Sequence, residues 1–158
     1  MAEPDYALLT SQLEALLEGE ADVLANASNF VGLLFNELDN INWLGIYVLR
    51  GDDLVLGPYQ GKPACVRIPL GKGVCGTAAA TQQTQRVSNV HEFPGHIPCD
   101  EISQSEIVVP LNVDGKLVGV LDIDSPSLDR FSETDQLGVE KICATFCAQL
   151  SGSALFDA

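Results

Sequence analysis

The sequence predicts an α+β domain with a largely antiparallel sheet. Two stretches of helical periodicity come first, about six strand-like segments follow with a short helix and a loop inserted, and one long helical stripe comes last. The chain of 158 residues shows no repeat, low-complexity segment or linker. We therefore expect a single domain over residues 1–158, large enough to bury a core without disulfides or metals.

Composition limits the partners of the protein. Eight basic residues against 22 acidic ones give a formal charge of −14, which repels nucleic acid and anionic membrane surfaces. The first residues lack the positive and apolar regions of a signal peptide, and no apolar run is long enough to span a membrane. We expect a cytoplasmic protein whose five cysteines are free thiols unless redox chemistry or a metal uses them.

The N-terminal half begins with two helices and a hairpin. Apolar residues recur with helical spacing over 6–17 and again over 23–38. The segment 42–49, NWLGIYVL, is rich in aromatic and β-branched residues. A Gly-Asp-Asp turn at 51–53 joins it to a second strand at 54–60, which predicts a β-hairpin.

The middle of the chain combines short elements. We expect a strand at 65–68, a helix at 74–82 and a strand at 85–90. The glycines at 71–73 could place phosphate at a helix start, but they lack the spacing of a P-loop, so we interpret them as a turn. The loop 91–100, HEFPGHIPCD, contains two prolines and a glycine, which exclude regular structure.

A second hairpin and a helix complete the fold. Strand-like segments at 105–113 and 116–124 flank Asp114-Gly115, a strong hairpin signal. Ser132 can cap the last helix, with Asp135 in the position of a capping-box acid. Apolar residues then form one stripe as far as Leu150.

The cysteines divide by position. Cys143 and Cys147 lie four apart on the apolar face of the last helix, which indicates buried structural residues. Cys65, Cys75 and Cys99 lie at strand ends or in loops, where burial and chemistry are both open to each one.

A zinc site would have to combine these three cysteines with His91 or His96. No CxxC or HxxxH pairing is present, so we expect no metal. Cys99 lies in a loop, where reactive groups are common, but Asp100 and Glu101 would raise its thiol pKa. Activation would need backbone amides, a helix N-terminus or a substrate that becomes reactive when protonated.

Two acids share one face of the last strand. Asp122 and Asp124 are two residues apart, so both side chains point the same way, as do those of Val118 and Val120. This neighbourhood predicts half-buried carboxylates.

Glu106 joins the two acids only in one hairpin register. A two-residue Asp114-Gly115 turn would place it opposite Ile123 on the wrong face, whereas a three-residue loop at 113–115 places it opposite Asp122. We favour the three-residue loop. Three close carboxylates would repel one another and raise at least one pKa, so the cluster could donate a proton or bind a cation.

Four segments resemble those of the free methionine-(R)-sulfoxide reductases, which are single GAF-domain enzymes: NWLGIYVL, LGPYQGKPACVRIPLGKGVCGTAAA, HIPCDEISQSEIVVPL and GVLDIDS. The match runs from about Tyr6 to Leu150. It implies a GAF-like fold with the N- and C-terminal helices packed on one face of the sheet. It also implies that Cys99 is the nucleophile, Cys65 the resolving cysteine and Cys75 an auxiliary cysteine, with a substrate pocket of Trp43, Tyr47, Glu106, Asp122 and Asp124.

The chemistry implied by this resemblance needs no metal or organic cofactor. A thiolate attacks the sulfoxide sulfur while an acid protonates the oxygen, which yields methionine and a sulfenic acid on Cys99. Cys65 then closes a disulfide that thioredoxin reopens. Trp43 and Tyr47, on one face of the first strand, could enclose the substrate side chain or simply pack in the core.

Recognition of a free amino acid requires groups for both its charges. We expect the three acids to bind the ammonium and backbone amides around Cys99 to bind the carboxylate, because no basic residue is visible near the motif. By analogy with similar GAF domains we also expect a homodimer through the terminal helices. A ligand-sensing GAF module and a thiol redox sensor are the alternatives.

Overall fold

A six-stranded antiparallel sheet with the order β3-β2-β1-β6-β5-β4 is the centre of this computed structural model, which describes residues 2–97 and 99–150. In chain order the elements are α1 (Tyr6–Leu17), α2 (Val23–Glu37), β1 (Trp43–Arg50), β2 (Asp53–Gln60), β3 (Arg67–Pro69), α3 (Gly73–Thr81), β4 (Gln85–Val87), the 3-10 helix η1 (Val90–Glu92), β5 (Ser105–Val113), β6 (Lys116–Ser125) and α4 (Glu133–Ala148). The predicted α+β, GAF-like architecture is confirmed.

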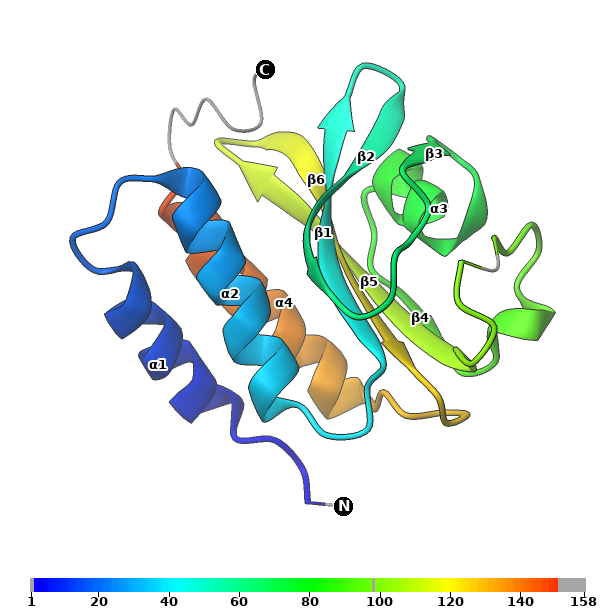
Figure 1. Cartoon of the computed structure of the whole chain (residues 1–158), viewed down its shortest axis with the longest axis horizontal. Coiled ribbons are helices and arrows are strands. Elements are labelled where there is room, and N and C mark those ends of the chain that lie inside the picture. Colours follow the sequence, from blue (N-terminus) through cyan, green and yellow to red (C-terminus); the bar gives the residue numbers. More distant parts are fainter. Residues whose placement is uncertain (1, 98, 151–158) are drawn as a thin grey trace.

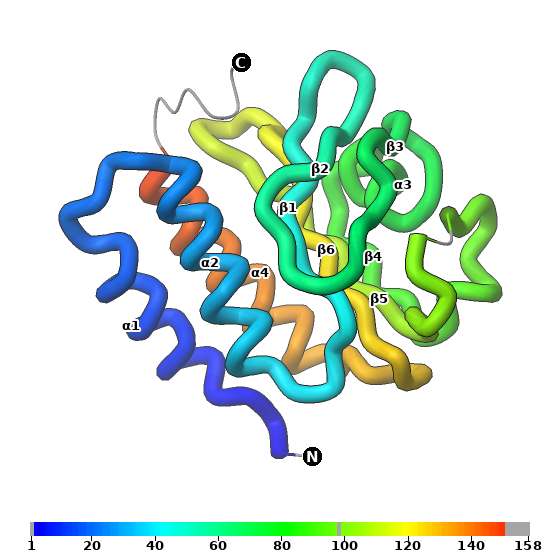
Figure 2. Tube along the Cα trace, viewed as in Figure 1, coloured from blue at the N-terminus to red at the C-terminus, as the bar shows by residue number. Residues whose placement is uncertain are grey.

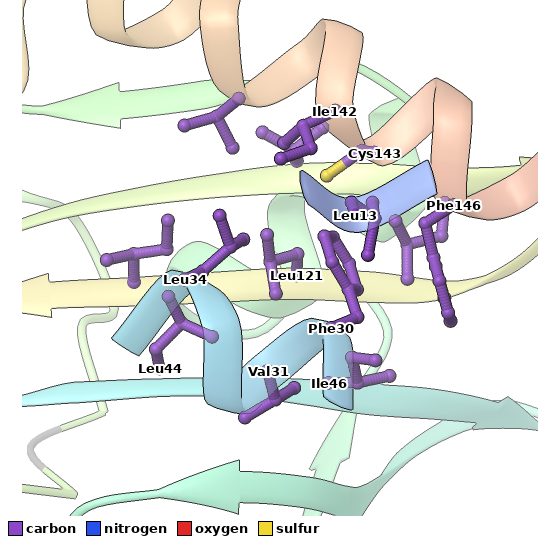
Figure 3. Close-up of a cluster of buried hydrophobic side chains, with 14 of the residues drawn as sticks. Leu13, Phe30, Val31, Leu34, Leu44, Ile46, Leu121, Ile142, Cys143 and Phe146 are labelled. Carbon is purple, nitrogen blue, oxygen red and sulfur yellow. The ribbon is translucent and has the colours of Figure 1, made fainter. Parts of the chain in front are cut away.

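The helices divide between the two faces of the sheet. Helices α2 and α4 pack on one face of the sheet, α1 packs on these two helices, and α3 lies on the other face (Figures 1 and 2). Alternation along β1 explains both cores: Leu44 and Ile46 point to the three helices, whereas Trp43 and Tyr47 point to α3. The larger core lies between the three helices and the sheet (Figure 3).

The helix boundaries follow from local capping. Asp5 and Asp22 cap α1 and α2 by accepting backbone N–H groups, and Ser132 with Asp135 forms the predicted capping box of α4. The predicted strands at 65–68 and 85–90 are shorter or displaced, since β3 is Arg67–Pro69 and β4 is Gln85–Val87. The expectation that loop 91–100 has no regular structure is wrong at its start, because the Asn89 side chain caps η1. Pro98 lies outside the described residues.

The β5–β6 hairpin differs from the predicted one, but it still places Glu106 on the same face as Asp122 and Asp124. The turn has two residues, Asp114 and Gly115, with φ of 52° and 79°, so the predicted three-residue loop is wrong. One extra residue in β6, Val118, then forms a bulge that shifts the register. Glu106 therefore pairs with Asp124, and all three acids lie on the α3 face of the sheet.

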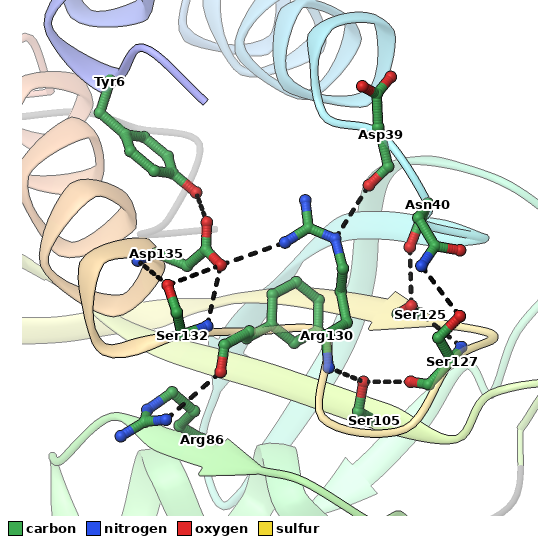
Figure 4. A network of polar contacts seen from close by, with 11 residues as sticks. Tyr6, Asp39, Asn40, Arg86, Ser105, Ser125, Ser127, Arg130, Ser132 and Asp135 are labelled. Atoms are coloured by element: carbon green, nitrogen blue, oxygen red, sulfur yellow. Dashed lines mark hydrogen bonds and ion pairs between the residues drawn. The ribbon is translucent and has the colours of Figure 1, made fainter. Parts of the chain in front are cut away.

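A buried polar network holds the ends of these strands (Figure 4). Arg130 and Asp135 form an ion pair at 3.1 Å, and the Tyr6 hydroxyl donates to Asp135 at 2.6 Å. Arg130 also donates from its backbone N to the Ser105 hydroxyl and from Nε to the Asp39 carbonyl. The network thus connects α1, α4 and the start of β5, next to Glu106. Removing one partner of the buried ion pair costs about 3–5 kcal/mol, so this connection is expected to be stable.

Among the described residues, every helix is too short or too polar to cross a bilayer.

Candidate active site

A cavity opens on the α3 face of the sheet. Its walls come from β1, the N-terminus of α3, the loop before β5, and the ends of β5 and β6. Seven of the eight residues predicted for the site line it: Trp43, Tyr47, Cys75, Cys99, Glu106, Asp122 and Asp124.

The eighth residue, Cys65, reaches the site through a covalent bond. The structure contains the expected disulfide between Cys65 and Cys99, whose Cα atoms lie 5.7 Å apart although 34 residues separate them in sequence. The carbonyl of Cys65 also accepts a hydrogen bond from the Tyr47 hydroxyl at 2.9 Å. Cys65 is therefore held against the aromatic wall, and Cys99 carries its sulfur to the cavity.

The three remaining cysteines are buried free thiols. Cys143 and Cys147 lie in the helix-side core, as their spacing predicts. Cys75 lies at the first turn of α3, where its Sγ faces Glu106 Oε2 at 4.0 Å. Burial, followed by the charges of Asp122 and Glu106, raises the pKa of the Cys75 thiol well above its usual range. Cys75 is thus a protonated group on the cavity wall.

The carboxyl cluster is the most perturbed part of the site. The side chains of Glu106 and Asp122 are each only 6% exposed, and Asp124 is half-buried. Burial is the main cause that raises the pKa of all three, and charge repulsion within the cluster adds to it for Glu106 and Asp124. Three such groups cannot all be ionised together, so the cluster retains a proton under conditions where exposed carboxyls have lost theirs.

One atom of this cluster lacks a partner within the described chain. Asp122 Oδ1 is buried and accepts no hydrogen bond. A buried carboxylate oxygen without a donor costs about 1–3 kcal/mol, so it favours a ligand that brings a proton or a positive charge. Cys75, Glu106 and Asp122 could also hold a metal ion, because their ligand atoms lie within 4.8 Å of one another.

An aromatic wall stands beside the acids. The Trp43 ring stacks on Tyr47 and Tyr59 with centroid distances of 5.9 and 5.4 Å, and its indole N–H donates to the Lys62 carbonyl. The stack is possible because β1 carries Gly45, where a Cβ atom would collide with Tyr59 and lie 2.6 Å from the Trp43 ring. Tyr59 supports this wall without lining the cavity, and sequence reasoning missed it.

The cavity also contains a basic residue, which corrects the expectation that none lies near the acids. Lys72 lines it together with the first turn of α3, Gly73 to Cys75. Lys72 is the N-cap of α3 but makes no capping hydrogen bond with its side chain. The amides of a helix start favour anions, so this end of the cavity is electropositive relative to the carboxyl cluster. The sequence signal for this residue was the Gly71-Lys72-Gly73 turn, which sequence reasoning considered only as a possible phosphate site.

Polar contacts anchor the loop that carries Cys99. Asn42 Nδ2 donates to Asp100 Oδ2 at 3.1 Å and to Ser103 Oγ at 3.0 Å, which ties the loop to the start of β1. Asp100, Ser103 and His96 all line the cavity, and sequence reasoning assigned none of them. Burial and the nearby His91 lower the pKa of His96.

Comparison with known proteins identifies the family of this site. The GAF domain model matches residues 11–150. The free methionine-R-sulfoxide reductase of Escherichia coli is 52% identical over 139 residues, which cover 88% of this chain and 84% of that protein. The fRMsr of Staphylococcus aureus in complex with substrate shares 49% identity with a TM-score of 0.91, covering 96% of this chain and 99% of the other. This chain belongs to the free methionine-(R)-sulfoxide reductase family of GAF-domain proteins.

A further member of the reductase family shows the same agreement. The free methionine-R-sulfoxide reductase of Neisseria meningitidis, also in complex with its substrate, is 40% identical with a TM-score of 0.87 and covers 94% of this chain and 92% of its own. The GAF match over residues 11–150 includes the positions of the aromatic wall, the disulfide and the carboxyl cluster. The family resemblance seen in the sequence motifs is therefore confirmed over this range.

Proposed function

We propose that this chain reduces free L-methionine (R)-sulfoxide to methionine, with Cys99 as the nucleophile and Cys65 as the resolving thiol. The observation that carries the proposal is the Cys65–Cys99 disulfide at a cavity that a proton-retaining carboxyl cluster also lines. A sulfoxide reduction needs both a thiol and an acid, and the family relationship supports the substrate class.

The chemistry balances over two thiols. Cys99 as a thiolate attacks the sulfoxide sulfur while a protonated carboxyl group donates to the oxygen, and the oxygen ends on Cys99 as a sulfenic acid when methionine leaves. Cys65 then attacks the Cys99 sulfur, which forms the disulfide and releases the oxygen as water. A thioredoxin-type dithiol supplies the two electrons that reopen the bond. Cys75 assists as a neutral donor beside Glu106.

The walls of the cavity match the parts of the substrate. Trp43 and Tyr47 enclose the methyl group and the side chain, and the carboxyl cluster receives the ammonium or the sulfoxide oxygen, for which Asp122 Oδ1 is free of other partners. Lys72 and the first amides of α3 meet the substrate carboxylate, in addition to the backbone around Cys99. A substrate lacking either main-chain charge then loses a partner worth about 1.5–3 kcal/mol.

Cysteine variants test the proposal directly. Cys99→Ser should abolish methionine formation, whereas Cys65→Ser should release up to one methionine per chain and then slow or stall. Product is measured by rapid quench and by steady-state turnover with dithiothreitol. Cys143→Ser, in the helix-side core, is the control and should turn over like the parent. Disulfide formation by peroxide without any methionine release would instead identify a thiol redox sensor.

We further propose a cytoplasmic homodimer. A reducing compartment supplies the dithiol that each cycle consumes. Exposed leucines on the terminal helices, Leu8 and Leu16 on α1 and Leu137 on α4, support pairing through that layer. Light scattering should give twice the 16.8 kDa chain mass, and a monomer mass would contradict the dimer.

A further inference from the structure

Two large apolar side chains stand exposed beside the disulfide. Val66, 61% exposed, directly follows Cys65, and Ile102, 48% exposed, is three residues beyond Cys99. The other large apolar side chains exposed among the described residues lie on the helices or in the loop before α4: Leu8, Leu16, Leu24, Leu128 and Leu137. Single exposed apolar residues are common, so the significance of this pair lies in its position.

The backbone holds both side chains in place. The carbonyl of Val66 accepts a hydrogen bond from Leu56 N of β2 at 2.9 Å. The amide of Ile102 donates to Asp100 Oδ1 at 3.1 Å, within the turn that Asn42 anchors to β1. Their exposure therefore belongs to two backbone segments that hydrogen bonds fix and that the disulfide links to each other.

The three free thiols of the chain cannot return the Cys65–Cys99 disulfide to two thiols. Cys143 and Cys147 are buried in the helix-side core, across the sheet from the cavity. Cys75 is buried on the cavity wall, and it could only exchange one disulfide for another. Reduction needs an external dithiol, whose catalytic thiol must reach one of the two sulfurs from solvent.

We propose that Val66 and Ile102 form the docking surface for this dithiol reductant and that its thiolate attacks the sulfur of Cys65. This inference rests on the proposed function, since it concerns the recycling step of that reaction. Apolar contacts suit a reductant that must recognise a disulfide within a strongly acidic protein, because they do not depend on the sign of its charge.

The choice of sulfur follows from the positions of the two cysteines. Cys99 lines the cavity, whereas Cys65 lies outside the lining and next to Val66. Attack at Cys65 forms a mixed disulfide there, breaks the Cys65–Cys99 bond and releases Cys99 as a thiolate into the cavity. The second thiol of the reductant then displaces Cys65, and the reductant departs as a disulfide. Two electrons enter the enzyme, and Cys99 is regenerated as the nucleophile.

Steady-state kinetics test the docking surface. Val66→Ser, Ile102→Ser and the double variant are compared with Leu24→Ser, a control of similar exposure on α2. Each single change should raise the KM for thioredoxin roughly tenfold, and the double variant should raise it further. Release of the first methionine in a single turnover should match the parent. An unchanged KM for thioredoxin in the double variant would overturn the docking surface.

A trapping experiment tests the attacked sulfur. Thioredoxin with its second active-site cysteine replaced by serine forms a stable mixed disulfide with the oxidised enzyme, and peptide mapping locates the bond. Linkage to Cys65 supports the inference, and linkage to Cys99 overturns it. Failure of the parent protein to release methionine at all would refute the proposed function, whereas methionine release with dithiothreitol but no reduction by thioredoxin would refute only the recycling step and this inference.

Discussion

Lys72 is the side chain by which, in the proposed function, the site distinguishes a free amino acid from the same residue within a protein. It lies at the start of α3 on the cavity, across from acids that cannot bind a carboxylate. A methionine sulfoxide inside a chain has no carboxylate for Lys72 to meet. At the scale of single residues, the proposed selectivity for the free form therefore rests on Lys72, a charge to which the sequence motif assigned no role.

Lys72→Gln should therefore weaken turnover of free methionine sulfoxide. Because Lys72 is exposed, we expect a loss near the lower end of a charge-assisted contact, about tenfold in kcat/KM. Methionine sulfoxide amide, which lacks the carboxylate, should be turned over equally by the parent and the variant. Lys62→Gln is the control, since Lys62 is equally exposed and does not line the cavity. Equal losses with both substrates would exclude a contact between Lys72 and the substrate carboxylate.

At the scale of the elements, apolar spacing and capping residues predict which segments form helices and strands, but they do not predict the register between strands. The helices α1, α2 and α4 and the strands β1, β2, β5 and β6 all follow from apolar spacing and turn residues. The Val118 bulge does not, because a β6 without it would satisfy the same local pattern, and only packing against β1 and β5 selects the register. The position of Glu106 beside Asp124 was therefore beyond the sequence, although its face was predicted correctly.

The disulfide, Tyr59 and His96 likewise depend on contacts that local sequence patterns do not predict. Pairing of Cys65 with Cys99 came from family resemblance, since a contact across 34 residues has no local signal. Tyr59 and His96 lie within the quoted segments, but no local pattern shows that the β1–β2 pairing brings Tyr59 to Trp43 or that the loop before β5 brings His96 to the cavity. Residues whose type suggested a chemical role could be assigned, whereas these two depend on tertiary structure for their place.

The contact between β1 and β2 at Gly45 gives a prediction at this scale. Gly45→Ala should force Trp43 away from Tyr59 and destabilise the fold by about 1–3 kcal/mol. The chain contains a single tryptophan, so its fluorescence reports this displacement, and denaturant unfolding reports the stability. Gly32→Ala is the matched control, because that site in α2 has no neighbour within 4 Å and alanine there should stabilise by about 0.5–1 kcal/mol. An unshifted spectrum in Gly45→Ala would contradict a rigid aromatic wall.

At the scale of the whole molecule, the carboxyl cluster of the active site lowers the free energy of unfolding. Three carboxyl groups with raised pKa values lie together on one sheet, with Glu106 and Asp122 buried and Asp124 half-buried. Their ionisation is more difficult in the folded chain than in the unfolded chain, where each has its ordinary pKa near 4. In the proposed mechanism this cost has a function, because the same pKa shifts retain the proton that the sulfoxide oxygen requires.

Stability should consequently fall as pH rises from about 5 to 8. In this window the folded state binds more protons than the unfolded state, so each group whose folded pKa lies above the ambient pH removes up to about 1.4 kcal/mol per pH unit. Asp124→Asn should flatten the slope and stabilise the protein most at pH 8, while lowering turnover. His96, whose pKa is lowered, contributes a slope of the opposite sign near pH 6 that is common to parent and variant.

Denaturant unfolding of the disulfide form at each pH measures the slopes, with the exposed Glu14→Gln on α1 as the charge-matched control. Parallel slopes for Asp124→Asn and the parent would show that Asp124 ionises as freely in the folded chain as in the unfolded one, and the proton donor would then have to be sought in Glu106 or Asp122.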